Sequence, residues 1–293
     1  MNREILKLAI PNIISNLSVP LLSLVDVALM GHLDSAEYII TIGFGVMIFN
    51  IVYWGFGFLR MGTTGFTAQE CGRQDNKECL LILGRALLIA VAGALLLIAF
   101  KTPLLKLSLL LIGTTPEVDA YVADYFNIRI LAAPATISLF AFTGWFFGMQ
   151  NARIPMILTI TVNLLNIGFS YWFVRVVGMK ADGVALGTLI AQYCGLILAL
   201  VFFYKSYRYM LPFWDKLELF HIGKMKKFLM ANSDIFIRTL CLIFAFSFFK
   251  VQSGKEGIIL GSANIILLEF IMISAYGIDG FSFAAESVVG KYF

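Results

Sequence analysis

Long apolar runs alternate along the chain with short polar clusters, in the pattern of helices that cross a membrane. A hydrocarbon core of about 30 Å takes about 20 helical residues to cross, and most of the runs reach that length. The longest polar connection, 205–225, is the best boundary between two parts of the chain. The pattern predicts helices near 5–32, 38–70, 80–100, 118–150, 154–178, 183–204, 226–251 and 258–290.

The composition agrees with a membrane protein and excludes a soluble globular one. The 293 residues are 60% hydrophobic and 14% charged, whereas soluble proteins carry about a quarter charged residues. The first helix lacks a small-residue cleavage pattern, so we interpret it as a span and not as a removable signal peptide. We therefore predict an all-α, polytopic membrane protein.

The distribution of Lys and Arg predicts the orientation of the chain in the membrane. When the loops are assigned to alternate sides, most of the 22 Lys and Arg fall on the side that holds the N-terminus. Because basic loops are retained in the cytoplasm, that side is predicted to be cytoplasmic. The formal net charge of +4 is then a topology signal, and the scattered basic residues give no support to nucleic-acid binding.

Motifs of common enzyme and metal chemistry are missing from the sequence. The 4 Cys form no CxxC pair, the 2 His are far apart, and HExxH, GxSxG and GxxxxGK[ST] do not occur. We expect no enzyme activity, no metal and no cofactor.

A weak internal repeat indicates two related bundles. The strings GTTGFTAQECG (62–72) and GFSFAAESVVG (280–290) both run from glycine to glycine, at an offset of 280 − 62 = 218 residues. Parallel repeats of membrane bundles are a common transporter plan. The repeat predicts a complete six-helix lobe at 1–204, a cytoplasmic linker at 205–225 and the first two helices of an incomplete second lobe at 226–293.

Polar side chains within the spans are the candidate functional residues, because each costs at least a few kcal/mol in hydrocarbon unless it meets a partner or water. Two predicted helices each present a polar stripe on one face. Hydrogen bonding between helices explains amides and hydroxyls equally well, but a carboxylate needs a proton, a cation or water. Asp26 is therefore the foremost candidate. The stripes are Asn12, Asn16, Ser23 and Asp26 on the first helix, and Thr159, Asn163, Asn166 and Ser170 on the fifth.

Depth in the membrane gives an independent criterion. Asp26, Ser170 and Thr188 all fall roughly 8 to 12 Å below the predicted outer surface, counted at about 1.5 Å per helical residue. Their convergence predicts a polar pocket that opens outward. Glu269, near the middle of the last helix, is a weaker candidate without an obvious partner.

A second group of charges lies near the cytoplasmic ends of two spans. Arg60, Asp279 and Glu286 are at comparable depth, and pairing of Arg60 with Asp279 in one conformation only would make a gate between the lobes. The competing interpretation is that Arg60 reaches the lipid headgroups with its long side chain.

Several strings together resemble the multidrug and toxic compound extrusion (MATE) family, and in particular the branch called DNA-damage-inducible protein F (DinF). The resemblance extends from end to end in consistent order. The strings are PNIISNLSVPLLSLVDVALMGHL (11–33), FLRMGTTGFTAQ (58–69), GWFFGMQNAR (144–153), DIFIRTLCL (234–242) and DGFSFAAESVVG (279–290).

The resemblance implies a monomeric, cation-coupled antiporter of the bacterial cytoplasmic membrane, which exports organic cations or amphipathic drugs by alternating access. The acidic position of the family's first helix falls on Asp26, its helix 5 amide on Asn166 and a following threonine on Thr188. The family's usual second Asp falls on Ser170, which is a departure. A single carboxylate favours H⁺ over Na⁺ as the coupling ion, because Na⁺ prefers more charged oxygen ligands.

Three alternatives remain open. A lipid-linked oligosaccharide flippase would show a cationic cavity, for which Arg60, Arg129 and Arg238 look too dispersed. A membrane prenyltransferase would need denser acidic motifs than DAYVAD (119–124). The most serious rival is a truncated fragment that does not transport, since the repeat predicts an intact length of about 430 residues.

Overall fold

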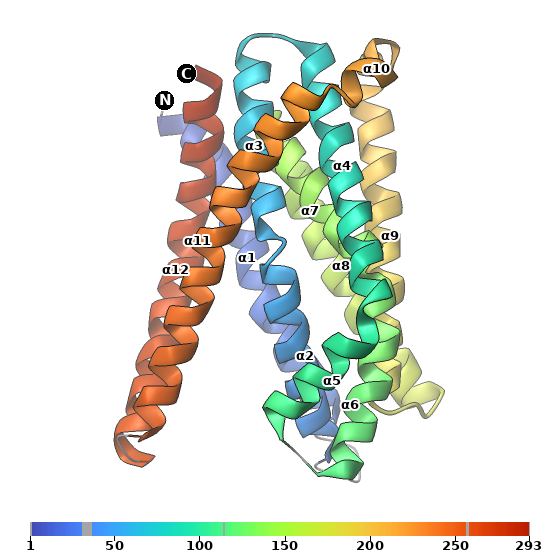
Figure 1. The fold of residues 1–293 in the computed structure, drawn as a ribbon, viewed down its shortest axis with the longest axis vertical. Helices are drawn as coiled ribbons and strands as arrows, with labels where there is room; N and C mark the ends of the chain where they lie inside the picture. The colour runs from blue at the N-terminus through green and yellow to red at the C-terminus, as the bar shows by residue number, and fades with distance from the viewer. Residues whose placement is uncertain (1, 31–36, 114, 256–257, 293) are drawn as a thin grey trace.

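The computed structural model describes residues 2–30, 37–113, 115–255 and 258–292, with some side chains of the first, second and last two helices outside that description. The described elements are all helical (Figure 1). They are α1 (Asn2–Met30), α2 (Glu37–Trp54), α3 (Gly57–Gly72), α4 (Asn76–Ala99), α5 (Lys101–Ile112), α6 (Pro116–Arg129), η1 (Ile130–Ala132), α7 (Ala133–Gly148), α8 (Arg153–Tyr171), η2 (Trp172–Val176), α9 (Ala181–Tyr207), η3 (Arg208–Phe213), α10 (Lys216–Leu219), α11 (Ile222–Lys255) and α12 (Ile258–Tyr292).

The helices are long enough for a multi-pass membrane protein, as the sequence predicts. Within the described residues, 6 helical stretches are long and apolar enough to cross a membrane. In addition, α1 is 29 residues long and α12 is 35. The six stretches are Ile40–Gly72, Asn76–Ala99, Pro116–Gly148, Arg153–Val176, Ala181–Phe213 and Lys216–Phe246.

Two of the predicted spans are interrupted in the structure. The span predicted at 38–70 breaks between α2 and α3, at Gly55 and Phe56, where glycine has a low helix propensity. The span predicted at 118–150 passes through the short 3₁₀ segment η1 before α7, whose second residue is Pro134. Proline lacks the N–H of a regular helical hydrogen bond, so the chain tightens there before α7 begins.

The segment between the predicted helices 80–100 and 118–150, to which the sequence pattern assigns no element, forms α5. The helix is rich in leucine, but at 12 residues it is too short to cross a membrane. Pro103 lies in the first turn, where it is tolerated, and Gly113 ends the helix with φ of +66°.

Helix α7 lies at the centre of the fold. Trp145, Phe142 and Phe146 are almost fully buried, and the Trp145 indole donates a hydrogen bond to the Cys79 carbonyl of α4 at 2.8 Å. On its other side α7 comes very close to α3, because a Cβ on Gly144 would overlap the backbone of Arg60. This close contact fixes the position of Arg60 relative to α7.

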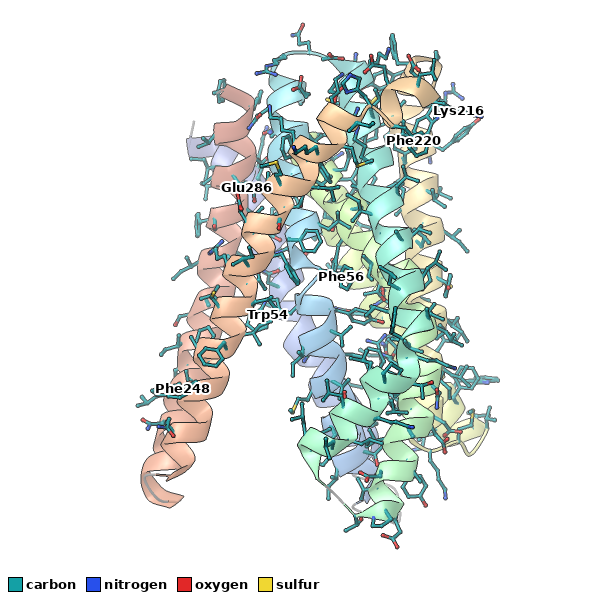
Figure 2. All side chains as sticks on the ribbon, in the orientation of Figure 1. Trp54, Phe56, Lys216, Phe220, Phe248 and Glu286 are labelled. Atoms are coloured by element: carbon teal, nitrogen blue, oxygen red, sulfur yellow. The ribbon has the colours of Figure 1, made fainter. Side chains whose placement is uncertain are left out.

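Helices α11 and α12 pack against each other. They contact the other helices through the half of each that lies at the end of the molecule where both chain termini are found (Figure 1). Phe228 packs on Phe66, and a Cβ on Gly290 would come within 2.8 Å of the Ala68 methyl group. The glycine-bounded strings 62–72 and 280–290 thus pack on one another. Toward the opposite end of the molecule, apolar side chains of α11 and α12 are exposed, and Figure 2 shows Phe248 directed away from the molecule.

The linker predicted at 205–225 contains η3 and α10, and it lies at the same end of the molecule as both termini (Figure 1). Arg85 of α4 holds it in place: its Nη2 donates to the Glu218 carbonyl at 3.0 Å and its Nε to the Leu219 carbonyl at 3.3 Å. Lys77 donates to Asp215 at 2.9 Å. This hydrogen bond, with one from the Glu218 backbone, holds the pKa of Asp215 below its usual range.

Candidate functional site

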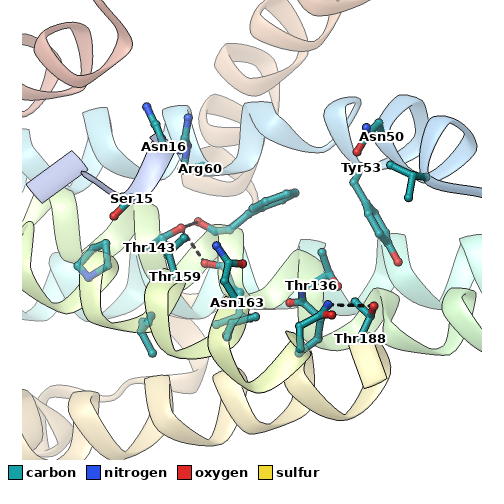
Figure 3. A pocket seen from close by; sticks show the side chains of 18 of the residues that line it. Ser15, Asn16, Asn50, Tyr53, Arg60, Thr136, Thr143, Thr159, Asn163 and Thr188 are labelled. Atoms are coloured by element: carbon teal, nitrogen blue, oxygen red, sulfur yellow. Dashed lines mark hydrogen bonds between the residues drawn. The ribbon is translucent and has the colours of Figure 1, made fainter. Parts of the chain in front are cut away.

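A cavity of about 380 Å³ lies between α1, α2, α3, α6, α7, α8 and α9 (Figure 3). Part of its wall is apolar and part carries amides, hydroxyls and two arginines. The lining residues are Asn12, Ser15, Asn16, Val46, Asn50, Tyr53, Arg60, Tyr125, Arg129, Thr136, Leu139, Phe140, Thr143, Phe147, Pro155, Leu158, Thr159, Val162, Asn163, Asn166, Thr188 and Gln192.

A buried chain of hydrogen bonds joins α8 to α9 at this cavity. Asn166 Nδ2 donates to Thr188 Oγ1 at 2.9 Å, and Ser170 Oγ donates to Asn166 Oδ1 at 3.1 Å. Thr188 in turn donates to the Val184 carbonyl of its own helix at 2.9 Å. All three side chains are buried, so their polar groups depend on one another for partners.

Close packing of the two helices positions this chain. A Cβ on Gly187 would lie within 2.7 Å of the Ser170 amide nitrogen and hydroxyl, so only a glycine lets α9 approach α8 here. The structure thus brings together Asn166, Ser170 and Thr188, three of the four residues that the sequence proposes for cation coupling. The fourth, Asp26, belongs to α1, and its side chain lies outside the described residues.

Both predicted polar stripes contribute residues to the cavity wall. They are Asn12 and Asn16 from α1 and Thr159, Asn163 and Asn166 from α8. Asn163 Nδ2 also donates to the hydroxyl of Ser18 at 2.8 Å, which joins α8 to a residue of α1 outside the predicted stripe. Of the remaining predicted cavity residues, Ser23 and Glu269 have side chains outside the described part of the chain.

The predicted gate residues do not form ion pairs in this structure. The guanidinium of Arg60 lies over the Phe283 ring of α12, with 3.8 Å between Cζ and the ring centre. Asp279 is exposed, and a carboxylate oxygen of Glu286 faces Gly65 of α3. Between Arg60 and either carboxylate, both of which the structure describes, there is no salt bridge.

Sequence reasoning missed several polar residues that the fold brings into the cavity. Arg129, Tyr53 and Thr136 come from α6, α2 and α7, and each has a buried polar atom without a hydrogen-bond partner among the described residues. The one sequence feature that could have identified this part of the cavity is the presence of an arginine, Arg129, inside a predicted span. Arg60 and Arg129 line one cavity and are thus not too dispersed to give it positive charge, contrary to the sequence-based expectation, whereas Arg238 is exposed on α11.

Metal ligands do not cluster in the described part of the chain: it contains no group of three or more His, Cys, Asp or Glu that would hold a metal ion. The chemistry that the cavity offers is therefore hydrogen bonding, positive charge and apolar contact.

Comparison with known proteins decides the family. The family model MatE matches residues 11–172, which is more than half of the 293 residues. The chain belongs to the MatE family. The matched segment runs from α1 to the start of η2, so it contains most of the residues that line the cavity.

Individual MatE relatives agree with this assignment. The chain is 34% identical to DNA damage-inducible protein F of Escherichia coli over 284 residues, which are 97% of this chain and 62% of that protein. It is 29% identical to multidrug and toxin extrusion protein 1 of Homo sapiens over 295 residues, covering 99% of this chain and 50% of the relative. The chain thus spans 50% to 62% of the length of these relatives.

Solved structures share the fold. A crystal structure of a MATE protein in the bent conformation superposes with a TM-score of 0.87 at 18% identity, covering 99% of this chain and 65% of the other. An outward-facing structure of a multidrug resistance MATE transporter of the MOP superfamily gives a TM-score of 0.84 at 18% identity, covering 98% of this chain and 64% of the other. MatE proteins are membrane transporters and not enzymes, as the sequence predicts.

Proposed function

We propose that this MatE chain carries out cation-coupled export of small amphipathic molecules, with the 380 Å³ cavity as the substrate site. The observation that carries the proposal is the buried cluster of Asn166, Ser170 and Thr188 at the wall of this cavity, within helices that are apolar enough to span a membrane. A site that combines apolar and polar walls suits a ligand with an apolar body and one polar group.

The coupling ion that we propose is H⁺, with Na⁺ as the alternative. The Asn166, Ser170 and Thr188 cluster offers only neutral oxygen atoms, so Asp26 is the one carboxylate that the sequence assigns to it. Protonation of Asp26 from the outer side would neutralise it and change its hydrogen bonding with α8. Protonation changes the equilibrium between two conformations only if H⁺ binds to one of them more tightly than to the other.

The proposed orientation places the end with both termini and α10 in the cytoplasm of a bacterial cell, because basic residues concentrate there (Figure 1). Alternating access would then open the cavity first to one side and then to the other. We propose that Arg60, Asp279 and Glu286 act at the cytoplasmic side as a gate. Reversal of charge at both Arg60 and Asp279 should restore transport that either single reversal abolishes.

Reconstitution of the purified chain in proteoliposomes tests the coupling. An outward-directed dye flux that requires an imposed pH gradient is expected for the unaltered chain and lost in Asp26→Asn. Asp124→Asn is the matched control, because Asp124 is an exposed acid on α6 and is not among the cavity residues. Efflux that persists in Asp26→Asn, or that follows a Na⁺ gradient instead, would refute H⁺ coupling through Asp26.

The same assay tests whether the chain transports at all. The E. coli relative, of which this chain spans 62%, serves as the reference under identical conditions. Pumping by the relative alone would assign this chain to the non-transporting alternative.

A further inference from the structure

Arg129 occupies an unusual place for a positive charge. It ends α6, in the middle of the span Pro116–Gly148, and it lines the cavity. The helical rise of about 1.5 Å per residue puts it about 20 Å from Pro116, which is too far for the side chain to reach the nearer surface. An arginine at this depth requires an anionic or polar partner, or water.

The described residues do not supply that partner. Nε and Nη1 of Arg129 are buried and have no hydrogen-bond acceptor there, and Arg129 has no ion pair among the described residues. Two aromatic rings of α2 hold the guanidinium instead, with Cζ at 5.5 Å from the centre of Phe49 and 5.9 Å from that of Tyr53. These rings position the charge without neutralising it.

Two hydroxyl groups lie next to Arg129 in the wall of the cavity. The Tyr53 hydroxyl lies close to Arg129 and Thr136. Tyr53 OH and Thr136 Oγ1 are both buried, and neither forms a hydrogen bond of accepted geometry with a described residue. Buried polar atoms are nearly always paired, so four such donor atoms on three residues of one cavity indicate a ligand that accepts hydrogen bonds.

The charge of the cavity has the same sign throughout the described lining. Its only charged residues there are Arg60 and Arg129, and no Asp or Glu is among those that line it. The lining also includes the apolar side chains of Leu139, Phe140 and Leu158. A guanidinium fork matches the two oxygens of a carboxylate, sulfonate or phosphate group, and the apolar wall matches a hydrophobic body.

We propose that the cavity binds an amphipathic organic anion, whose acidic group is held by Arg129 together with the hydroxyls of Tyr53 and Thr136. This proposal rests on the cavity being the substrate site, and it replaces the organic cation that the family resemblance implies with a substrate of opposite charge. It concerns binding, so it holds or fails independently of whether the chain transports.

Equilibrium binding to the purified chain in detergent tests the proposal with two dyes of one shape. Fluorescein and rhodamine 123 share a xanthene ring system, and at pH 8 the first is an anion and the second a cation. Fluorescence anisotropy should show fluorescein binding about tenfold more tightly or better, which is the contribution of a charge-assisted hydrogen bond. Tighter binding of rhodamine 123 would overturn the proposal.

Variants assign the preference to Arg129. Arg129→Gln should weaken fluorescein about tenfold or more and leave rhodamine 123 no weaker, while Arg129→Lys keeps the charge but loses the fork and falls between. Arg238→Gln is the matched control, since Arg238 lies in a span but outside the cavity. An equal loss in Arg129→Gln and Arg238→Gln would refute a specific site.

Two further arms keep the result interpretable. Should Arg129→Gln fail to elute as a folded species, Tyr53→Phe removes a single hydroxyl and should still weaken fluorescein selectively; unchanged binding there would count against the site. If a short-chain phosphatidylglycerol displaces fluorescein at concentrations below that of fluorescein itself, in an Arg129-dependent way, the site belongs to a lipid headgroup and the proposal is overturned. Arg129-dependent binding without efflux driven by either a pH or a Na⁺ gradient would refute the proposed function alone.

Discussion

Arg60 on α3 lies over the ring of Phe283 on α12, with 3.8 Å between its Cζ and the ring centre. Phe283 is buried and stacks on Phe147 of α7 at 6.2 Å between ring centres. Phe283 therefore links α12 to the helices that line the cavity. The contact that joins α3 to α12 at this point is a cation–π interaction.

Substitution of Phe283 should weaken this link. Phe283→Leu loses the cation–π contact and part of the packing on Phe147, which should cost about 1–2 kcal/mol of unfolding free energy. Thermal unfolding of the purified chain in detergent measures the loss. Phe281→Leu is the control, because Phe281 lies on the same helix and is exposed. Similar shifts of the melting temperature in both variants would contradict the assigned role.

The packing of α12 on α1 depends on Gly280. A Cβ there would overlap the Ile13 side chain and come within 3.2 Å of the Ala9 carbonyl oxygen, whereas a Cβ on Gly277 would meet nothing within 4 Å. Gly280→Ala should destabilise the chain by about 1–3 kcal/mol through overpacking. Gly277→Ala should be neutral or slightly stabilising, since alanine is the better helix former. The melting temperatures of the two variants test this prediction. A lower melting temperature in Gly277→Ala alone would exclude the packing of α12 on α1 at Gly280.

The hydrogen-bond chain at the cavity wall makes a graded prediction. Ser170→Ala removes one buried hydrogen bond and should cost about 1 kcal/mol, while Asn166→Ala removes the acceptor of Ser170 and the donor to Thr188, two buried hydrogen bonds, and should cost about 2–3 kcal/mol. Ser108→Ala is the control, because its hydroxyl bonds only to the Leu104 carbonyl of its own helix. Chemical or thermal unfolding gives the order, and a larger loss in Ser108→Ala would contradict it.

The anchoring of the linker predicts a pattern of proteolysis. Arg85 is buried, it pairs with Glu78 at 2.6 Å and it also binds two carbonyls of α10, so Arg85→Gln breaks a buried pair at a cost of about 3 kcal/mol. Cleavage near Phe220 by chymotrypsin should accelerate markedly. Lys77→Gln breaks only the exposed pair with Asp215, whose attraction is screened by solvent, and should change the rate little. Equal acceleration in both variants would argue against Arg85 as the anchor.

Much of the fold follows from local patterns. Apolar runs longer than a bilayer crossing predict the spans, and spacings of three and four residues place Thr159, Asn163, Asn166 and Ser170 on one side of α8. The pattern fails at α5, which is too short to signal a span and whose Lys101, Lys106 and Ser108 are typical of a polar connection. It also fails at the α2 to α3 break, since one glycine in an apolar run does not by itself end a helix.

The sequence by itself determined which residues lie in spans, which face of α8 is polar and, through the match at 11–172, the family. Only the tertiary structure decided that Arg60 and Arg129 line one cavity, that Arg60 meets Phe283 and that Asn166 binds Thr188. Helical periodicity fixes the directions of side chains around one axis. The rotation and approach of neighbouring helices depend on contacts between residues far apart in the chain, such as those of Gly144 and Gly187, and a one-dimensional pattern does not contain them.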